Sequence, residues 1–523
     1  MQKRLLFSGL LSITFLLLCV IAVIPVAGNP AYQMNPTDQQ ATVNAIVDER
    51  LTATAVGQSS NLATPAVEAS ITPVPTLTLM PTIVFEGSFS DTRTNPGETV
   101  LIMDVSQDTF EFYLEGWEQY WRGDYDDALD EFDEAIDLEP DWAEAYFSRA
   151  ISYSGQGDYD DGLDEIQTAN ELMGELDPGM VGWRLFIQIQ ESNTAEAILD
   201  GERILAENRS DIIGVSNLAY SYFEDEQFQA ALDVIDVVFE YAPNDLFSFD
   251  LRRDAHDELN LDDDSRFDEA MIDGIEAYQD GDYDDAVEYF EDAIDDAEDT
   301  TRPNFNMAIA SWNLALVLLV DGETDDAFDV LDSALELSPE MGTLYYLKAI
   351  AQYNTGVDED EILENINAGI EIDPDYPNNY IFRAFFYADE GNEELSTQDN
   401  WQYLQLKQSH ILLWQNVDPL EDELRLPFFL GWQHRFVVEA EAENRLSVSA
   451  SESGIGSSNV DALIIVLDPS GNPIASNNDD NSSTYDADIS RFELPEDGEY
   501  TVIISTGPVL GDGMLDVEIE LDN

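Results

Sequence analysis

Residues 280–295 read Asp-Gly-Asp-Tyr-Asp-Asp-Ala-Val-Glu-Tyr-Phe-Glu-Asp-Ala-Ile-Asp, and residues 122–137 read Arg-Gly-Asp-Tyr-Asp-Asp-Ala-Leu-Asp-Glu-Phe-Asp-Glu-Ala-Ile-Asp. In both stretches Gly-Asp-Tyr is a turn signal, and the residues after it place small and apolar side chains at helical spacing. Shorter copies at 157–162 and 322–327 keep the same order. Such a recurrence predicts a series of helical hairpins with a period of about 34 residues.

Working outward from these stretches divides the middle of the chain into repeat units. Each unit combines a first helix with aromatic or aliphatic side chains, the turn, a second helix with small residues where its partner packs, and a proline or polar stop. The units are 109–142, 143–176, 178–211, 212–245, 267–300, 308–341, 343–376 and 377–410. The 178–211 unit departs from the pattern at Gly201, and the 377–410 unit loses it after Gly391.

This pattern resembles the tetratricopeptide repeat, a family of helical hairpins. The resemblance implies an all-α superhelical solenoid over 109–245 and 267–414. Residues 246–266 do not fit and separate the solenoid into a first and a second arm; we expect a lone helix from Asp245 to Asn260 and a loop over Leu261–Asp264. A long helix from Trp401 to Trp414 is expected to cap the second arm, because the last repeat of a solenoid must cover its apolar face.

The apolar period changes from 3.6 to 2 after Pro427. Segments such as Ala462-Leu-Ile-Ile-Val-Leu467 and Glu499-Tyr-Thr-Val-Ile-Ile-Ser505 are rich in β-branched residues, and turn signals lie between them, so 427–523 is predicted to be an antiparallel β-sandwich. The stretch 461–480 followed by 494–502 resembles the bacterial pre-peptidase C-terminal domain, which implies a jelly-roll-like module of secreted proteins.

The N-terminal residues indicate export. Lys3 and Arg4 precede an apolar run and then small residues up to Gly28, so residues 1–28 are either a cleaved signal peptide or an uncleaved signal anchor. Residues 29–100 are rich in Thr, Pro and Ala and are predicted to be a disordered stalk. We therefore expect an extracytoplasmic protein that is secreted or anchored to the cell membrane by its N-terminal segment.

Composition excludes several classes of function. The formal net charge is −90, which disfavours nucleic acid and anionic membrane surfaces as partners and favours cationic proteins, basic peptides or divalent cations; solubility alone also explains such a charge. The single cysteine, Cys19, allows no disulfide framework. No nucleophile elbow, zinc-binding His-Glu-x-x-His or phosphate-binding loop occurs, so we expect no catalytic residues and no cofactor.

Two acidic patterns have the spacing of calcium sites. Asp280, Asp282, Asp284 and Glu291 match a helix-loop-helix calcium loop, but Asp285 stands where that loop needs glycine, and the repeat explains all of these residues. The better candidate lies in the β-sandwich. Its ligands would be the loop carboxylates Asp461, Asp468, Asp479 and Asp480, although turn chemistry also explains Asx-rich loops.

The resemblance also indicates where a partner binds. Solenoids of this family use the inner face of their first helices, and these positions are apolar and aromatic here. The candidate partner groove consists of Trp117, Trp121, Phe147, Tyr220, Phe223, Trp312 and Leu316. The alternative is that several of these rings belong to the core and cover the end of the solenoid.

The leading hypothesis is a non-enzymatic scaffold or adaptor that binds a protein or peptide, apolar or basic in character, in this groove. The alternatives are a secreted hydrolase or its accessory subunit, with the β-sandwich targeting a surface or substrate, and a passive spacer of the cell envelope.

Overall fold

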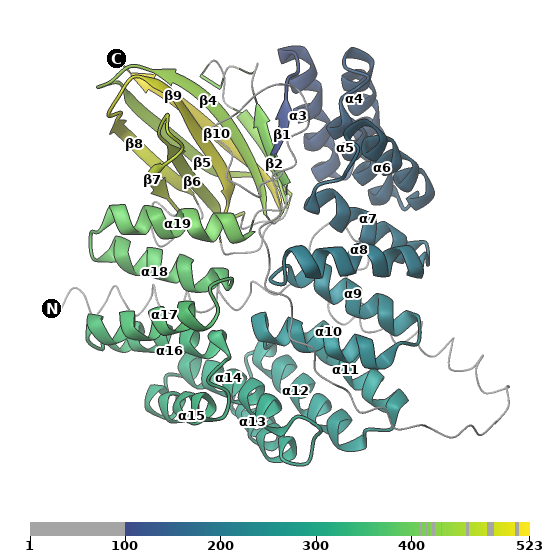
Figure 1. Cartoon of the computed structure of the whole chain (residues 1–523), viewed down its shortest axis with the longest axis vertical. Coiled ribbons are helices and arrows are strands. Elements are labelled where there is room, and N and C mark those ends of the chain that lie inside the picture. Colours follow the sequence, from purple (N-terminus) through teal and green to yellow (C-terminus); the bar gives the residue numbers. More distant parts are fainter. Residues whose placement is uncertain are drawn as a thin grey trace.

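The structure is a computed structural model. It describes residues 100–407, 410–414, 417, 419–420, 424–429, 431–456, 460–478, 486–507 and 512–522. The predicted signal segment and stalk at 1–99, with Cys19, lie outside these residues. The described chain is a helical solenoid followed by a β-rich region in two sheets (Figure 1).

The first arm consists of helical hairpins in chain order. They are α3 (Gln107–Arg122) with α4 (Tyr125–Leu138), α5 (Ala143–Gln156) with α6 (Tyr159–Met173), α7 (Pro178–Gln190) with α8 (Thr194–Glu207), and α9 (Ile212–Glu224) with α10 (Phe228–Tyr241). The second arm follows α11 (Leu246–Leu259). It consists of α12 (Asp262–Asp280) with α13 (Tyr283–Ala297), α14 (Pro303–Asp321) with α15 (Thr324–Leu337), α16 (Gly342–Thr355) with α17 (Glu359–Ile372), and α18 (Pro377–Asp389) with α19 (Glu393–Lys407).

Glycines explain both the turn and the close packing of a hairpin. Gly123 and Gly281 end their helices at φ 82°, a left-handed conformation that favours glycine. Within the helices, a Cβ at Gly116 would lie 2.6 Å from the ring of Phe132 in the partner helix, and one at Gly274 would lie 2.5 Å from Phe290. The same close approach therefore recurs in both arms.

Basic residues join the two helices of several hairpins at a constant spacing of 16 residues. Arg149 pairs with Glu165 at 2.7 Å, Arg184 with Asp200 at 2.6 Å, and Arg383 with Asp399 at 2.7 Å. In each case the arginine lies on the first helix and the carboxylate on the second. Three of the few cations of the chain thus hold hairpins together in the same way.

The same spacing changes the interpretation of residues 246–266. Arg252 of α11 pairs with Asp268 of α12 at 2.6 Å, so α12 is the second helix of a hairpin with α11. The Gly-Asp-Tyr turn at 281–283 makes α12 also the first helix of a hairpin with α13. The contacts between alternate helices accordingly run α3–α5–α7–α9–α11 and then α12–α14–α16–α18.

The expected loop at Leu261–Asp264 is wrong, because α12 begins at Asp262 and Leu261 is its N-cap. Aspartates are favourable in the first turn of a helix, where they face the positive end of its dipole. The acidic run is therefore a helix start, while α11 occupies the segment where a lone helix was expected.

Helix α14 is apolar and long enough to cross a membrane by length and composition. Two-thirds (67%) of its most apolar window is buried inside the protein, however. Its composition is explained by its position in the core of the second arm.

Two sheets form the C-terminal region. The larger has the order β1-β2-β4-β9-β6-β7 and the smaller β3-β10-β5-β8. The strands are β1 (Val100–Met103), β2 (His410–Trp414), β3 (Leu424–Phe428), β4 (Trp432–Ala440), β5 (Arg445–Gly456), β6 (Ala462–Leu467), β7 (Pro473–Asn477), β8 (Ala487–Glu493), β9 (Gly498–Thr506) and β10 (Gly513–Asp522).

The expected capping helix over 401–414 is also wrong. Helix α19 ends at Lys407, and His410–Trp414 is the strand β2, parallel to both β1 and β4. All five residues of β2 are buried, and a short apolar run buried on both faces has no period that distinguishes strand from helix. The sheet therefore begins before Pro427 and includes β1, which precedes the first helix.

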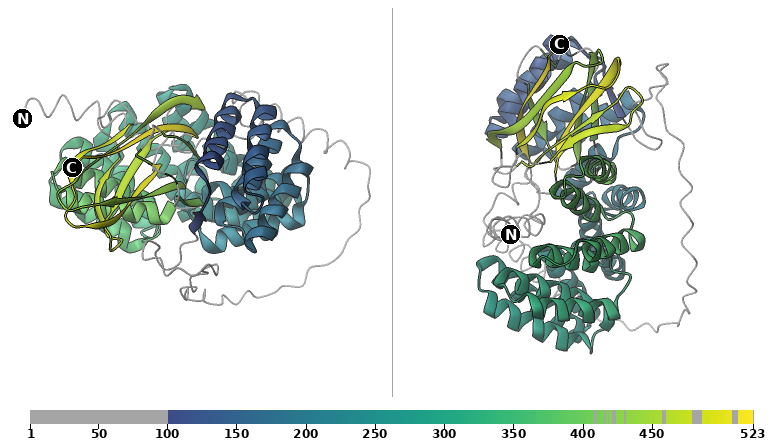
Figure 2. Two further views of the ribbon diagram at one scale, coloured as in Figure 1. Left: turned by 90° about the horizontal axis from the view of Figure 1, so that it is seen from above. Right: turned by 90° about the vertical axis from the view of Figure 1, so that its left-hand side faces the viewer.

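Strand β1 closes the chain into a ring. It leads directly into α3 and pairs with β2, which follows α19, so the two ends of the solenoid meet at one sheet (Figure 1). Viewed from above, the sheets lie beside the N-terminal helices of the first arm, which are drawn in purple (Figure 2). The arms also touch each other, since the Nδ2 of Asn313 donates to the carbonyl of Pro243 at 2.8 Å.

Candidate functional site

The inner-face positions of the repeat behave differently along the first arm. Counted from residue 109 in the first repeat unit and from the first residue of α5, α7, α9 and α11, the ninth position holds Trp117, Ile151, Phe186, Tyr220 and Asp254. Trp117 and Ile151 are fully buried, whereas the other three are partly exposed. The ninth position is therefore fully covered at α3 and α5 and only partly covered at α7, α9 and α11, although Trp183 of α7 still packs against Phe429 at 5.2 Å.

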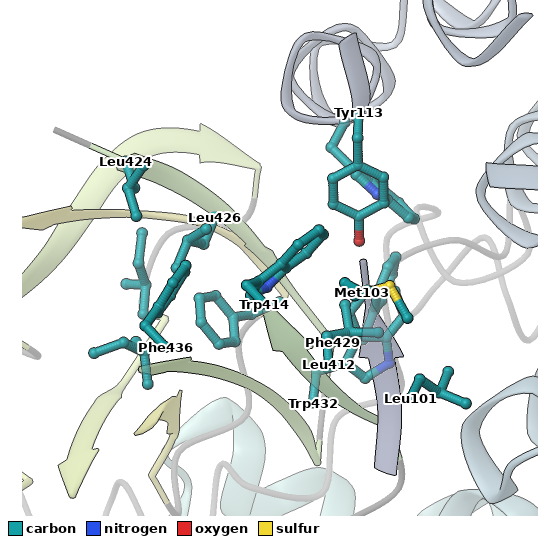
Figure 3. Close-up of a cluster of buried hydrophobic side chains, with 14 of the residues drawn as sticks. Leu101, Met103, Tyr113, Leu412, Trp414, Leu424, Leu426, Phe429, Trp432 and Phe436 are labelled. Carbon is teal, nitrogen blue, oxygen red and sulfur yellow. The ribbon is translucent and has the colours of Figure 1, made fainter. Parts of the chain in front are cut away.

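The cover is the chain's own β-sandwich. The ring of Trp117 lies 5.6 Å from both Phe429 and Trp432, between centroids. Phe110 and Tyr113 contact Trp414 of β2 at 4.5 and 5.4 Å. Figure 3 shows Trp414 between Tyr113 on one side and the core of the sheets on the other.

The predicted groove residues of the first two units are therefore covered, Trp117 and Phe147 fully and Trp121 in part. Trp117 and Phe147 are 0% exposed, and Trp121 lies 5.0 Å from Phe429. Phe147 contacts both His410 and Trp432. These rings form the interface with the β-sandwich. This placement agrees with the alternative prediction, in which several of the rings belong to the core at the end of the solenoid.

A buried charged cluster lies at the centre of this interface. His410 of β2 has its Nδ1 2.5 Å from Asp177 Oδ2 and its Nε2 3.1 Å from Glu144 Oε2. All three side chains are fully buried. Asp177 is also the N-cap of α7, where it accepts from the amide of Met180 at 2.8 Å, and Glu144 accepts from the hydroxyl of Tyr113 at 3.3 Å.

Both nitrogens of His410 face a carboxyl group, so the doubly protonated imidazolium, which carries a hydrogen on each nitrogen, suits a site in which both of these groups are ionised. Burial alone would lower the pKa of His410, but Asp177 and Glu144 outweigh burial and raise it to about 10. Burial raises the pKa of Glu144, and His410 opposes that shift. Sequence reasoning missed this cluster because its members lie far apart in the chain and no local spacing links them.

A second buried histidine, His434 on the neighbouring strand β4, is neutral. His434 accepts from Nε1 of Trp414 at 3.1 Å and donates its own Nε2 hydrogen to the carbonyl of Pro427 at 2.8 Å. These partners suit a neutral ring, and burial lowers the pKa of His434 to about 3. The interface thus holds one charged and one neutral imidazole.

The predicted groove residues of the second arm are buried as well. Trp312 is 5% exposed and Leu316 is 1% exposed, and Nε1 of Trp312 donates to the carbonyl of Thr343 on α16. They belong to the core that joins the helices of the second arm. The expectation that these two side chains face an open groove is therefore corrected.

Tyr220 and Phe223 remain partly exposed, as predicted for groove residues, together with other rings. Phe186 precedes Tyr220 at the same repeat position, and Phe247 of α11 lies 6.2 Å from Tyr220. We call Phe186, Tyr220, Phe223 and Phe247 the aromatic row. It lies on the first helices α7, α9 and α11, which contact one another in that order.

The end of the aromatic row on α11 is acidic. Asp250 and Asp254 share a single cation, Arg253, at 2.9 and 2.8 Å. Burial raises the pKa of Asp250 to about 6, and Arg253 opposes the shift while Asp254 and Glu276 add to it. An apolar surface therefore gives way to a negatively charged one along the same face.

The structure separates the two described residues of the predicted calcium site. Asp461 precedes β6 and Asp468 follows it, so seven residue steps of extended chain, roughly 23 Å, lie between them. Asp468 instead forms a turn, in which its carboxylate accepts from the amides of Ser470 and Asn472. Asp479 and Asp480 lie outside the described residues, and within the described ones no group of three or more His, Cys, Asp or Glu side chains could hold a metal ion.

Comparisons with known proteins agree with the helical repeat. Residues 118–157 and 274–342 match family models described as TPR repeat and tetratricopeptide repeat. No curated protein matches the chain.

Similar solved structures include a MamA RS-1 ArsTM double mutant, which is 15% identical over 34% of this chain and 98% of that chain with a TM-score of 0.33. A tetratricopeptide repeat protein from Parabacteroides merdae is 15% identical over 50% and 93%, with a TM-score of 0.23. The TPR2AB-domain:pHSP90 complex of yeast Sti1 is 18% identical over 56% and 98%, with a TM-score of 0.21. The family-model matches identify tetratricopeptide repeats at residues 118–157 and 274–342, and repeats of this class typically serve as non-enzymatic scaffolds for protein–protein interaction.

Proposed function

We propose that this protein is a non-enzymatic extracytoplasmic scaffold that binds an extended protein segment on its aromatic row. One observation carries the proposal. At the ninth repeat position, the side chains are buried beneath the β-sandwich at Trp117 and Ile151 and partly exposed at Phe186, Tyr220 and Asp254.

The chemistry of this face defines the partner. Partly exposed aromatic rings favour apolar or aromatic side chains, and rings of this kind are typical anchors of interfaces. The carboxylates of Asp250 and Asp254 favour a basic side chain at the α11 end. The expected ligand is therefore a segment with apolar residues that lie against α7 and α9, followed by lysine or arginine.

The β-sandwich has a structural part in this proposal. Its resemblance to pre-peptidase modules suits a secreted protein, but one side of it is occupied by the rings of α3 and α5. A module that closes the ring is less available as a free targeting domain. This use of its surface supports the scaffold over an accessory subunit of a hydrolase.

A peptide-binding assay tests the proposal. Fluorescent peptides of alternating leucine and lysine are titrated into the full chain, into Phe186→Ala/Tyr220→Ala, and into Tyr289→Ala, which removes an exposed ring of α13. A charge of −90 attracts any cation, so the titrations are done at physiological salt and compared between variants.

Loss of affinity in the double variant alone is the expected result. Equal affinity of all three proteins would reject the aromatic row. A matching leucine–glutamate peptide should not bind, and turnover of any peptide substrate by the purified chain would contradict the non-enzymatic proposal.

The extracytoplasmic location has a separate test. Fractionation of cells that express the full chain should place it outside the cytoplasm. The mass of the mature protein shows whether residues 1–28 are removed or retained as an anchor. Recovery of the intact chain from the cytoplasm would contradict this part of the proposal.

A further inference from the structure

We propose that the β-sandwich is a releasable occupant of the inner face of the first arm, and that the positive charge of His410 keeps it in place. This inference does not depend on the aromatic row. It concerns the adjoining part of the same face, where the family's binding positions are filled by the chain itself.

Strand β2 of the β-sandwich lies against the inner face of the first arm, where the family binds an extended ligand. Residues at inner-face positions of α3 and α5 contact one short extended segment, the strand β2. Trp414 at one end of β2 packs against Phe110 and Tyr113, and His410 at the other end packs against Phe147 and pairs with Glu144.

The charge on His410 is required by geometry. A neutral imidazole carries one hydrogen, so one of its nitrogens would direct a lone pair at a buried carboxylate. Neither Nε2 of His410 nor Oε2 of Glu144 makes a hydrogen bond among the described residues, so the attraction between opposite charges 3.1 Å apart is what replaces that repulsion. Two buried carboxylates without a cation would be strongly unfavourable.

The groups that face His410 come from every element packed around it. They are Tyr113 on α3, Glu144 on α5, Asp177 at the start of α7, and the neutral His434 on β4. The nearby Lys407 at the end of α19 interacts instead with Asp211. His410 is thus the only cation that these elements place against the two carboxylates in the described structure.

The direction of the pH dependence follows from the raised pKa of His410. A group whose pKa is higher in the closed state than its ordinary value of 6.5 stabilises that state fully below pH 6.5. This stabilisation declines above 6.5 and is lost as the pH passes about 10. Alkaline solution should therefore release the β-sandwich from α3 and α5.

Tryptophan exposure measures this release. Trp117, Trp142, Trp414 and Trp432 lie at the interface and are buried. Acrylamide quenching of tryptophan fluorescence is followed from pH 7 to 11, and far-UV circular dichroism reports whether the helices remain. Quenching should rise with a midpoint near the pKa of His410 while the helical signal persists.

Three variants of the full chain separate the charge of His410 from general alkaline effects. Glu144→Gln keeps an acceptor for Tyr113 and supplies an amide donor for a neutral ring, so its alkaline transition should disappear. His410→Gln leaves one carboxylate without a donor, so its tryptophans should be quenched already at pH 8. In His410→Gln/Glu144→Gln the two amides satisfy each other and Asp177, and protection should return.

Ionisation of the tyrosines outside the cluster is common to all four proteins and cancels in the comparison. Burial and Glu144 both raise the pKa of Tyr113, so replacement of Glu144 makes Tyr113 ionise more readily, which acts against the expected loss of the transition. An alkaline transition of the same size in Glu144→Gln would overturn the proposal, and so would full protection in His410→Gln. If His410→Gln fails to fold, the proposal still stands or falls on the transition of Glu144→Gln.

Discussion

The two arms are built from the same repeat, yet their inner faces meet different surroundings. In the first arm, the inner face of α3 and α5 is covered by the β-sandwich, more than 250 residues away in sequence, and it becomes partly exposed from Phe186 of α7 onward. In the second arm, Trp312 and Leu316 are covered within the helical array itself. Repeat position alone therefore does not decide whether a side chain is partly exposed or belongs to the core.

The junction between the arms depends on one buried ion cluster. Arg252 is 2% exposed, packs over the rings of Phe239 and Phe249, and pairs with Asp268, which also accepts from His256 at 2.7 Å. Because α12 belongs to a hairpin on each side, this cluster lies where the first arm becomes the second.

Asp268→Ala should have the largest effect on the comparison between the arms. Removal of one partner of a buried pair leaves an uncompensated charge and costs about 3–5 kcal/mol. The free energy of unfolding is measured by denaturant titration. Asp133→Ala serves as the control, because that carboxylate pairs with Arg149 at an exposed position and such pairs contribute about 0–1 kcal/mol. Similar losses in both variants would show that the junction has no special role.

The repeat itself was predictable, because its determinants lie within one period. Gly123 and Gly281 end helices at the turns that the sequence pattern marked, and α11 occupies the segment that did not fit the repeat. The shared role of α12 was not predictable from the pattern. Arg252 and Asp268 are 16 residues apart, like the ion pairs within other hairpins, but this spacing indicates a hairpin only after both residues are known to lie on neighbouring helices.

The pairing of β1 with β2, which closes the ring, could not be predicted from local sequence patterns. Strand β1 is four residues long, and its partner β2 follows more than 300 residues later. The apolar residues of β2 have no period that favours a strand over the end of a capping helix. For the same reason Trp117 and Phe147 had the pattern of an open groove, and only the fold shows that Trp432 and Phe429 cover them.

Alanine at Gly116 and at Gly274 compares the two arms at matched positions. In each, the new Cβ would collide with a buried phenylalanine ring, Phe132 or Phe290, that has no room to move. Overpacking of this kind costs about 1–3 kcal/mol. Equal losses in the two variants, measured by thermal unfolding, would confirm that hairpin packing is the same in both arms. A loss only at Gly116 would assign the constraint to the cover of the β-sandwich instead.

The smallest effect is expected at the boundary between the covered and the open face. Tyr113, Phe147 and Gly182 are the fifth residues of the repeat units 109–142, 143–176 and 178–211; the first two are buried, and a Cβ at Gly182 would meet nothing within 4 Å. Gly182→Ala should therefore stabilise the protein by about 0.4–1 kcal/mol, because alanine loses less backbone entropy in a helix and has free space here. A small rise in melting temperature checks this expectation. Destabilisation would instead mean that the cover extends over α7, and the aromatic row that begins at Phe186 would then be shorter than the structure shows.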